Sequence, residues 1–147
     1  MADPRPYRKV LSTLSIEGKH ILEIGAGHGE LTALILEQLP RTIIAYEIEH
    51  GLCTLRHPQL FVCESDVQLA DAAIFDNVAV ISTPPYSLLP FLRARIDEHD
   101  VRDVVLMIPP RQREHFADFR VLGEFPGESF SPPDRGTHLL IARGFLR

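Results

Sequence analysis

Short apolar runs alternate along the chain with segments whose apolar residues recur every three or four positions. Apolar runs bounded by turn residues are typical of buried strands, and the longer period indicates amphipathic helices. The predicted strands are 20–24, 42–47, 60–64, 78–82, 101–108, 121–125 and 136–145. One predicted helix buries Leu31, Leu34, Ile35 and Leu39 and ends at Pro40. The other predicted helices are the segments 49–56, 87–96 and 111–119.

This alternation of strands and helices predicts the α/β class, with a mostly parallel, seven-stranded, Rossmann-like sheet covered by helices on both faces. The last two strands are expected to form an antiparallel hairpin at its edge. The length of 147 residues suits a single domain, 1–147, in which 1–19 form a helical or extended N-terminal segment. No apolar run reaches the roughly 20 residues needed to cross a bilayer, and the first residues do not resemble a signal peptide. We therefore expect a cytoplasmic protein without a membrane partner.

Charge and composition narrow the classes of function. The chain has 20 acidic and 15 basic residues, a net charge of −5. This argues against a protein that coats nucleic acid, because phosphate contacts dominate such binding, but it does not exclude a local basic face. Arg93, Arg95, Arg111 and Arg113 are candidates for phosphate contacts, or for a mixed solvated surface with the acids among them. The cysteines and histidines have no metal-ligand spacing, so no metal is expected.

Ligands of open parallel sheets bind beyond the carboxyl ends of the strands, which makes the loops after the first strands the candidate site. Gly25 and Gly27 follow the first strand, where glycines let the backbone approach a ligand closely; many α/β turns are also glycine-rich without binding one. Glu47 ends the second strand, 20 residues after Gly27. A carboxylate there can accept hydrogen bonds from both hydroxyls of a ribose, or cap the next helix.

The loop after the third strand and the end of the first one refine this ligand. Asp66 is placed to accept from the amine of an adenine, with Val67 beside the ring; alternatively, Asp66 caps the following segment. Glu23, directly before the glycines, would repel a pyrophosphate and attract a cation. Because S-adenosylmethionine carries an ammonium and a sulfonium group and no phosphate, these residues favour it over a dinucleotide.

The fourth strand is followed by Thr83-Pro84-Pro85-Tyr86, which is either a simple strand stop or a catalytic motif. With this motif the chain resembles the rRNA adenine N6-dimethyltransferases of the KsgA type, which include the erythromycin-resistance methylases. The resemblance extends from about residue 20 to the C-terminus, through the segments 23–32, 46–49, 65–67, 83–86 and 130–133. It implies a Rossmann-like class I methyltransferase fold, with S-adenosylmethionine as the cofactor.

The resemblance also assigns roles to residues. The implied cofactor-binding residues are Glu23, Gly25, Gly27, Glu47, Ile48, Asp66, Val67 and Thr83. Of these, the two glycines line the methionine part, Glu47 holds the ribose and Asp66 the adenine amine. The implied catalytic residues are Thr83, Pro84, Pro85, Tyr86 and Phe130.

The chemistry explains why such residues are needed on the reaction side. An adenine amine is a poor nucleophile because its lone pair is delocalised into the ring. A side-chain oxygen at position 83 and the Pro84 carbonyl can hold its two N–H bonds, so catalysis is mostly positioning and electrostatics. Tyr86 would stack on the base, which must leave any helix, and Phe130 would help to enclose it. The family carries asparagine where this chain has Thr83.

The expected function is therefore S-adenosylmethionine-dependent N6-methylation of adenine in ribosomal RNA. One alternative is methylation of another amine or amide, such as a protein glutamine. The other is a catalytically degenerate module that binds the cofactor or a partner, and Thr83, in place of the family's asparagine, favours it. Relative to the family, residues 1–19 contain no Gln-Asn-Phe-Leu type motif, and a C-terminal helical domain that contributes to RNA binding is expected to be absent. Weak or assisted RNA binding is thus expected, with a protein partner that supplies the missing domain.

Overall fold

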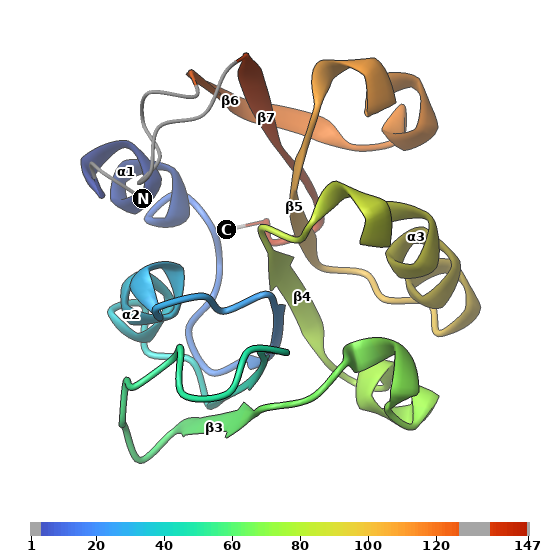
Figure 1. The fold of residues 1–147 in the computed structure, drawn as a ribbon. Coiled ribbons are helices and arrows are strands. Elements are labelled where there is room, and N and C mark those ends of the chain that lie inside the picture. The colour runs from blue at the N-terminus through green and yellow to red at the C-terminus, as the bar shows by residue number, and fades with distance from the viewer. Residues whose placement is uncertain (1–3, 127–135, 147) are drawn as a thin grey trace.

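The computed structural model describes residues 4–126 and 136–146, which form one seven-stranded sheet with helices on both faces (Figure 1). The strands are β1 (His20–Ile24), β2 (Thr42–Tyr46), β3 (Leu60–Cys63), β4 (Ala79–Ser82), β5 (Val104–Ile108), β6 (Arg120–Pro126) and β7 (Thr137–Arg143). The α-helices are α1 (Arg5–Leu11), α2 (Glu30–Leu36) and α3 (Leu89–Glu98), and the 3₁₀ segments are η1 (Val67–Leu69), η2 (Ala72–Phe75), η3 (Tyr86–Leu88) and η4 (Pro110–Phe116). Within these ranges, no helix is long and apolar enough to cross a membrane.

The strand order is β3-β2-β1-β4-β5-β7-β6, with β1 to β5 parallel and β7 and β6 antiparallel. This confirms the predicted mostly parallel sheet with an antiparallel edge hairpin. Because β1 lies between β2 and β4, the sheet extends from β1 in two directions. β2 and β3 lie on one side of it, and β4, β5, β7 and β6 lie on the other. The crevice at such a switch point is where open α/β sheets bind their ligands.

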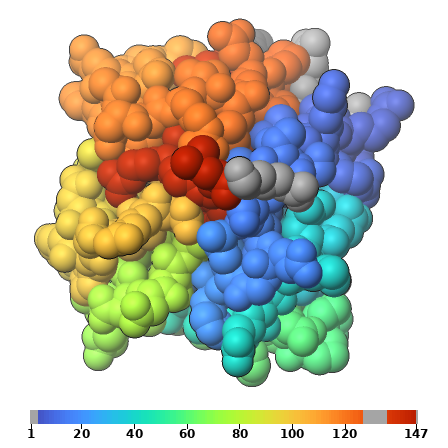
Figure 2. Space-filling view, turned by 180° about the vertical axis from the view of Figure 1, so that it is seen from behind, coloured from blue at the N-terminus to red at the C-terminus, as the bar shows by residue number. Residues whose placement is uncertain are grey.

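Two apolar layers hold the sheet between its helices. On one face α1 and α2 pack against Ile21, Ile43 and Ile81, and on the other face α3 and the 3₁₀ segments pack against Leu22, Val80 and Leu106. The strands β4 and β5 are buried throughout, as their continuous apolar runs predicted. Seen from behind in Figure 2, the end of β7 lies against the segment that leads into β1, where the Ser15 amide donates to the Phe145 carbonyl at 3.1 Å.

The predicted helix 49–56 is wrong, because these residues form turns. Two carboxylates bind backbone amides of this segment in its turn conformation. Glu47 Oε2 accepts from the Glu49 amide at 2.8 Å, and Glu64 accepts from the Gly51 amide. Gly51 also has a left-handed φ of 77°, which a helix cannot contain.

The other helices differ from prediction at their ends. Leu39 is not on the buried face of α2: the helix ends at Leu36, Leu39 adopts a φ of 57°, and its side chain is 67% exposed. The segment 87–96 begins as η3 before it becomes α3. The segment 111–119 is the 3₁₀ segment η4, which ends at Phe116, where the Arg113 guanidinium binds the carbonyl oxygen at 2.6 Å.

Candidate cofactor and acceptor site

A cavity of about 220 Å³ lies at the carboxyl ends of the parallel strands β1 to β4. Six of the predicted site residues line it: Gly25, Glu47, Ile48, Asp66, Val67 and Pro85. Ser65, Gln68, Ser87 and Leu88 line it as well and were not predicted as site residues. The volume is below the roughly 300–1,000 Å³ of cavities that bury a whole drug-sized ligand, so it suits one part of such a ligand.

Larger hollows lie elsewhere on the molecule. One of about 560 Å³ is at the amino ends of β1, β4 and β5 and is lined by residues such as Lys19, His99 and Asp103. It lies at the opposite edge of the sheet from the switch-point crevice. The smaller cavity is the better candidate site, because it lies where parallel α/β sheets bind ligands and it gathers carboxylates from two strand ends.

Glu47 is held in place by backbone amides. The Gly27 amide donates to its Oε1 and the Glu49 amide to its Oε2, both at 2.8 Å, and the side chain is only 8% exposed. A carboxylate oxygen can accept two hydrogen bonds. Because each oxygen has a single donor among the described residues, each keeps one lone pair, and the pair of oxygens suits two neighbouring hydroxyls.

Asp66 caps η1, since its Oδ1 accepts from the Gln68 amide at 2.9 Å. The capping interpretation is thus correct, and among the described residues no hydrogen bond to Oδ2 is formed. Val67 is buried, whereas Ile48, from the loop after β2, keeps 65% of its side chain exposed beside the same cavity. Apolar side chains together with a carboxylate in one cavity are what a planar ring with an amino group requires.

The glycine turn joins this cavity to the Thr83–Pro85 segment. Gly25 has a φ of 80°, and a Cβ at this position would lie 3.5 Å from the Thr83 carbonyl oxygen and 3.7 Å from Pro85 Cδ. Gly27 has a φ of 59°, and a Cβ there would meet nothing within 4 Å. The backbone at Gly27 therefore faces open space, as a turn that a ligand approaches closely must.

Glu23 is fully buried behind the glycine turn. The Thr32 hydroxyl donates to its Oε1, whereas its Oε2 has no hydrogen-bond partner in the described part of the chain. Burial raises the pKa of Glu23 to about 7, the charge of Glu47 pushes the pKa in the same direction, and the Thr32 hydrogen bond opposes the shift. Glu23 does not line the cavity, and because an unpaired buried charge is costly, its burial favours the protonated carboxyl.

The predicted catalytic residues follow β4 beside the cavity. Thr83 is half-buried and Pro84 is buried, and neither lines the cavity itself. The Tyr86 phenol is hydrogen-bonded to Nδ1 of His138 on β7, with the ring centroids 5.7 Å apart. Phe130 lies outside the described residues. Sequence reasoning missed His138, because no local spacing connects it with Tyr86.

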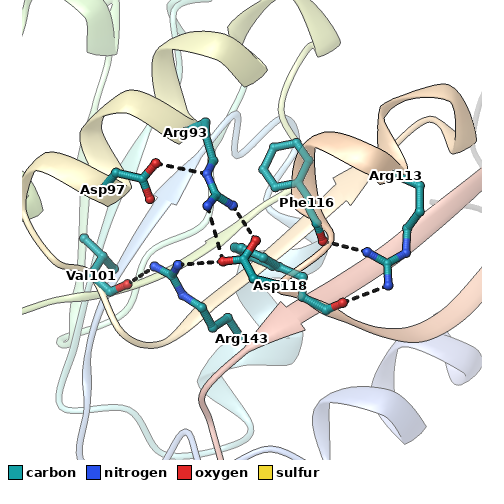
Figure 3. Close-up of polar contacts among 8 residues, drawn as sticks. Arg93, Asp97, Val101, Arg113, Phe116, Asp118 and Arg143 are labelled. Carbon is teal, nitrogen blue, oxygen red and sulfur yellow. Dashed lines mark hydrogen bonds and ion pairs between the residues drawn. The ribbon is translucent and has the colours of Figure 1, made fainter.

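Neighbouring groups of the protein form hydrogen bonds or ion pairs with three arginines, namely Arg93, Arg113 and Arg143 (Figure 3). Arg93 binds both oxygens of Asp118, at 3.0 and 3.3 Å, and its Nε binds Asp97 at 3.1 Å. Arg143 also binds Asp118, at 3.0 Å. Arg113 donates to the carbonyl oxygens of Phe116 and Phe119. For Arg93, this network favours the mixed surface over a phosphate site.

The fold is the one that Rossmann-like methyltransferases have. Two solved structures match nearly all of it. The 23S rRNA methyltransferase ErmE has a TM-score of 0.82 at 18% identity, covering 98% of this chain and 69% of that one. A dimethyladenosine transferase from Plasmodium falciparum has a TM-score of 0.83 at 18% identity, covering 97% and 62%.

Relatives with similar sequences indicate a narrower group of proteins than the similar folds do. Ribosomal RNA small subunit methyltransferase A of Chlorobaculum tepidum is 34% identical over 110 residues, which are 69% of this chain and 40% of the relative. The protein of the same name from Prosthecochloris aestuarii is 33% identical over 95 residues, 60% of this chain and 36% of the relative. These matches confirm the resemblance to the rRNA adenine dimethyltransferases, although the chain spans less than half the length of these relatives. No model of a known protein family matches the chain.

Proposed function

We propose that this protein is an S-adenosylmethionine-dependent methyltransferase that methylates N6 of adenine in ribosomal RNA. The observation that carries the proposal is the meeting of the Glu47 and Asp66 carboxylates with the glycine turn in one cavity, directly beside Thr83–Pro85. The relatives' names support the substrate, since ErmE is a 23S rRNA methyltransferase and the Plasmodium falciparum protein a dimethyladenosine transferase.

The described residues fit the cofactor in two parts. Glu47 offers two oxygens to the ribose hydroxyls, while Asp66 Oδ2 accepts from the adenine amine between Ile48 and Val67. Glu23 is fully buried beneath the glycine turn, so its negative charge would act on the cationic methionine part from a distance, without contact. The cofactor contributes an electrophilic methyl group on a positively charged sulfur. Everything else in the reaction is positioning by the protein.

On the acceptor side, the chain must hold an amine in line with that methyl group. The Thr83 hydroxyl has no hydrogen bond to another described residue, so it can accept from one N–H bond. The Pro84 carbonyl can accept from the other. Holding both N–H bonds favours a pyramidal nitrogen whose lone pair points outward, and the Tyr86 ring then supports the base.

The same proposal covers partners and compartment. The net charge is −5, and Arg93 and Arg143 are paired with Asp118 and so are not free for phosphate contacts. We therefore propose weak or assisted RNA binding in the cytoplasm, with a protein partner that supplies further RNA-binding surface.

The test has two stages. Calorimetric titration should show micromolar binding of S-adenosylmethionine and none of NAD. Incubation with methyl-labelled cofactor and ribosomal RNA, followed by nucleoside analysis, should then yield N6-methylated adenosine. Label found only in glutamine of added ribosomal protein would show that the substrate is a protein and not RNA. Failure to bind the cofactor would overturn the proposal.

Replacing Glu47 by alanine should weaken S-adenosylmethionine binding about 10- to 150-fold, the equivalent of about 1.5–3 kcal/mol for hydrogen bonds to a charged group. Calorimetry measures this change. The matched control is Glu49→Ala, because Glu49 contributes its backbone amide to Glu47 and keeps it in the variant. Equal affinities for the two variants would remove Glu47 from the site.

Position 83 separates an active enzyme from a binding module. Thr83→Asn should keep or raise the rate of adenine methylation, because an amide oxygen also accepts from the acceptor amine. Thr83→Val, which removes the hydroxyl at nearly constant volume, should lower kcat about 10- to 100-fold without changing cofactor affinity. An unchanged kcat in Thr83→Val would exclude the hydroxyl from the reaction, and no turnover by wild type or Thr83→Asn would favour the binding module.

A further inference from the structure

The Tyr86 side chain is turned away from the cofactor cavity. Its neighbours Pro85, Ser87 and Leu88 line that cavity, whereas Tyr86 does not. The phenol instead reaches the antiparallel part of the sheet, where it meets His138 on β7. Tyr86 therefore stands at the boundary between the cofactor cavity and the space beside β7.

The direction of β7 brings His138 to this boundary. Because β7 runs antiparallel to β5, it begins where β5 ends, and Leu139 pairs with Ile108, the last residue of β5. His138 therefore lies at the end of the sheet where the carboxyl ends of the parallel strands are found. It is 8% exposed and lies opposite Phe125 of β6.

The contact holds the Tyr86 ring by its hydroxyl group. The phenol oxygen and His138 Nδ1 are joined by a hydrogen bond, and the two rings are inclined at 41° with their centroids 5.7 Å apart. At this inclination the imidazole does not stack face to face on the phenol ring. His138 therefore fixes the far end of the tyrosine side chain rather than covering its face.

Further aromatic residues pack close to this contact. Tyr7 of α1 is almost fully buried and stacks on Phe125, with ring centroids 4.4 Å apart and an interplanar angle of 21°. Tyr86 packs against the same apolar cluster, which contains both Tyr7 and Phe125. The segments α1, β6 and β7 thus form one wall behind the Tyr86 ring.

We propose that His138 is a positioning residue that, through its hydrogen bond to the Tyr86 phenol, fixes the Tyr86 ring as the platform for the acceptor base. The inference rests on the proposed function, because it assigns Tyr86 to the acceptor. A tyrosine side chain turns about two bonds, and anchoring its hydroxyl restricts both before the substrate arrives. Such preorganisation lowers the cost of reaching the reactive geometry.

A double-mutant cycle tests the coupling. Tyr86→Phe and His138→Leu should each lower kcat about tenfold with unchanged affinity for S-adenosylmethionine, and the double variant should be no slower than the slower single variant. His138→Asn, which offers a polar atom near the position of Nδ1, should recover most of the rate. Independent losses that multiply to about 100-fold, or no recovery by His138→Asn, would overturn the proposal.

A second measurement needs no turnover. Nuclear magnetic resonance of ring-labelled tyrosine resolves the three tyrosines of the chain, and the signal missing in Tyr86→Phe identifies Tyr86. His138→Leu should shift or broaden this signal, and His138→Asn should leave it near its wild-type position. An unchanged Tyr86 signal in His138→Leu would refute the positioning role. If wild type transfers no methyl group to RNA, the proposed function fails while this result still decides the role of His138.

Discussion

The variant Glu23→Gln is expected to gain stability relative to wild type as the pH rises from 4.5 to 7. The pKa of the buried Glu23 carboxyl is raised from 4.5 to about 7. Between these values the folded protein keeps a proton that the unfolded chain has lost, so the folding stability of wild type falls with rising pH. The free energy of unfolding of wild type therefore falls by about 3 kcal/mol between pH 4.5 and pH 7. Below pH 4.5 none of this loss has occurred, and above pH 7 it is complete.

Glutamine removes this titration without removing the group that Thr32 contacts. Urea unfolding of both proteins at pH 5, 6, 7 and 8 measures the effect as a change in the difference between them, which cancels other titrating groups. Asp118, whose pKa is lowered by its hydrogen bond to Arg93, titrates below its ordinary value and outside this range. Parallel pH profiles of wild type and variant would show that Glu23 is ionised in the folded protein throughout.

Cofactor binding provides a second check on the same group. If the negative charge of the buried Glu23 attracts the cationic part of S-adenosylmethionine, the ligand favours the protein with Glu23 ionised. The ionised fraction rises about fivefold from pH 6 to pH 7 for a pKa near 7, so wild-type affinity should rise to a similar extent. The affinity of Glu23→Gln should stay flat over this interval.

The parallel part of the sheet could be predicted because its strands are buried on both faces. Such strands appear as continuous apolar runs, and β1 has the predicted bounds. The same reasoning located Glu47 and Asp66, because residues that directly follow parallel strands meet at one edge of the sheet. The cavity that joins them with Gly25 confirms that they come together.

The features that were missed depend on contacts between distant segments. The turn in 49–56 is stabilised by Glu64, which directly follows β3 and accepts from the Gly51 amide. No local pattern around Gly51 records that contact. Likewise, His138 meets Tyr86 only because β7 runs antiparallel to β5, and the sequence predicts the hairpin without its register. Such contacts require the full topology.

The largest loss of stability is expected from Gly144→Ala, by about 3–5 kcal/mol. Gly144 follows β7 with a left-handed φ of 76°, and a Cβ there would lie 2.5 Å from the Arg102 carbonyl oxygen and 3.0 Å from Asp103 Cα. Both are backbone atoms, so a flexible side chain cannot relieve the overlap. The conformation itself costs an alanine about 1–2 kcal/mol.

The rest of the loss comes from Asp103, which an added methyl group would displace. One of its oxygens accepts from the Phe145 amide at 2.7 Å, and the other binds Lys19 Nζ at 3.1 Å. These bonds anchor the buried Phe145 ring against the segment before β1, and a hydrogen bond to a charged group contributes about 1.5–3 kcal/mol. Moving Asp103 therefore loosens the end of β7 from the rest of the sheet.

The matched control is Gly18→Ala, which separates backbone strain from the overlap. Gly18 has a φ of 75°, nearly that of Gly144, but a Cβ there would meet nothing within 4 Å. Urea unfolding should show a loss of only about 1–2 kcal/mol for this variant, the cost of the left-handed conformation alone. Equal losses in the two variants would mean that Asp103 moves aside without cost, and that its contacts with Lys19 and the Phe145 amide do not hold the end of β7.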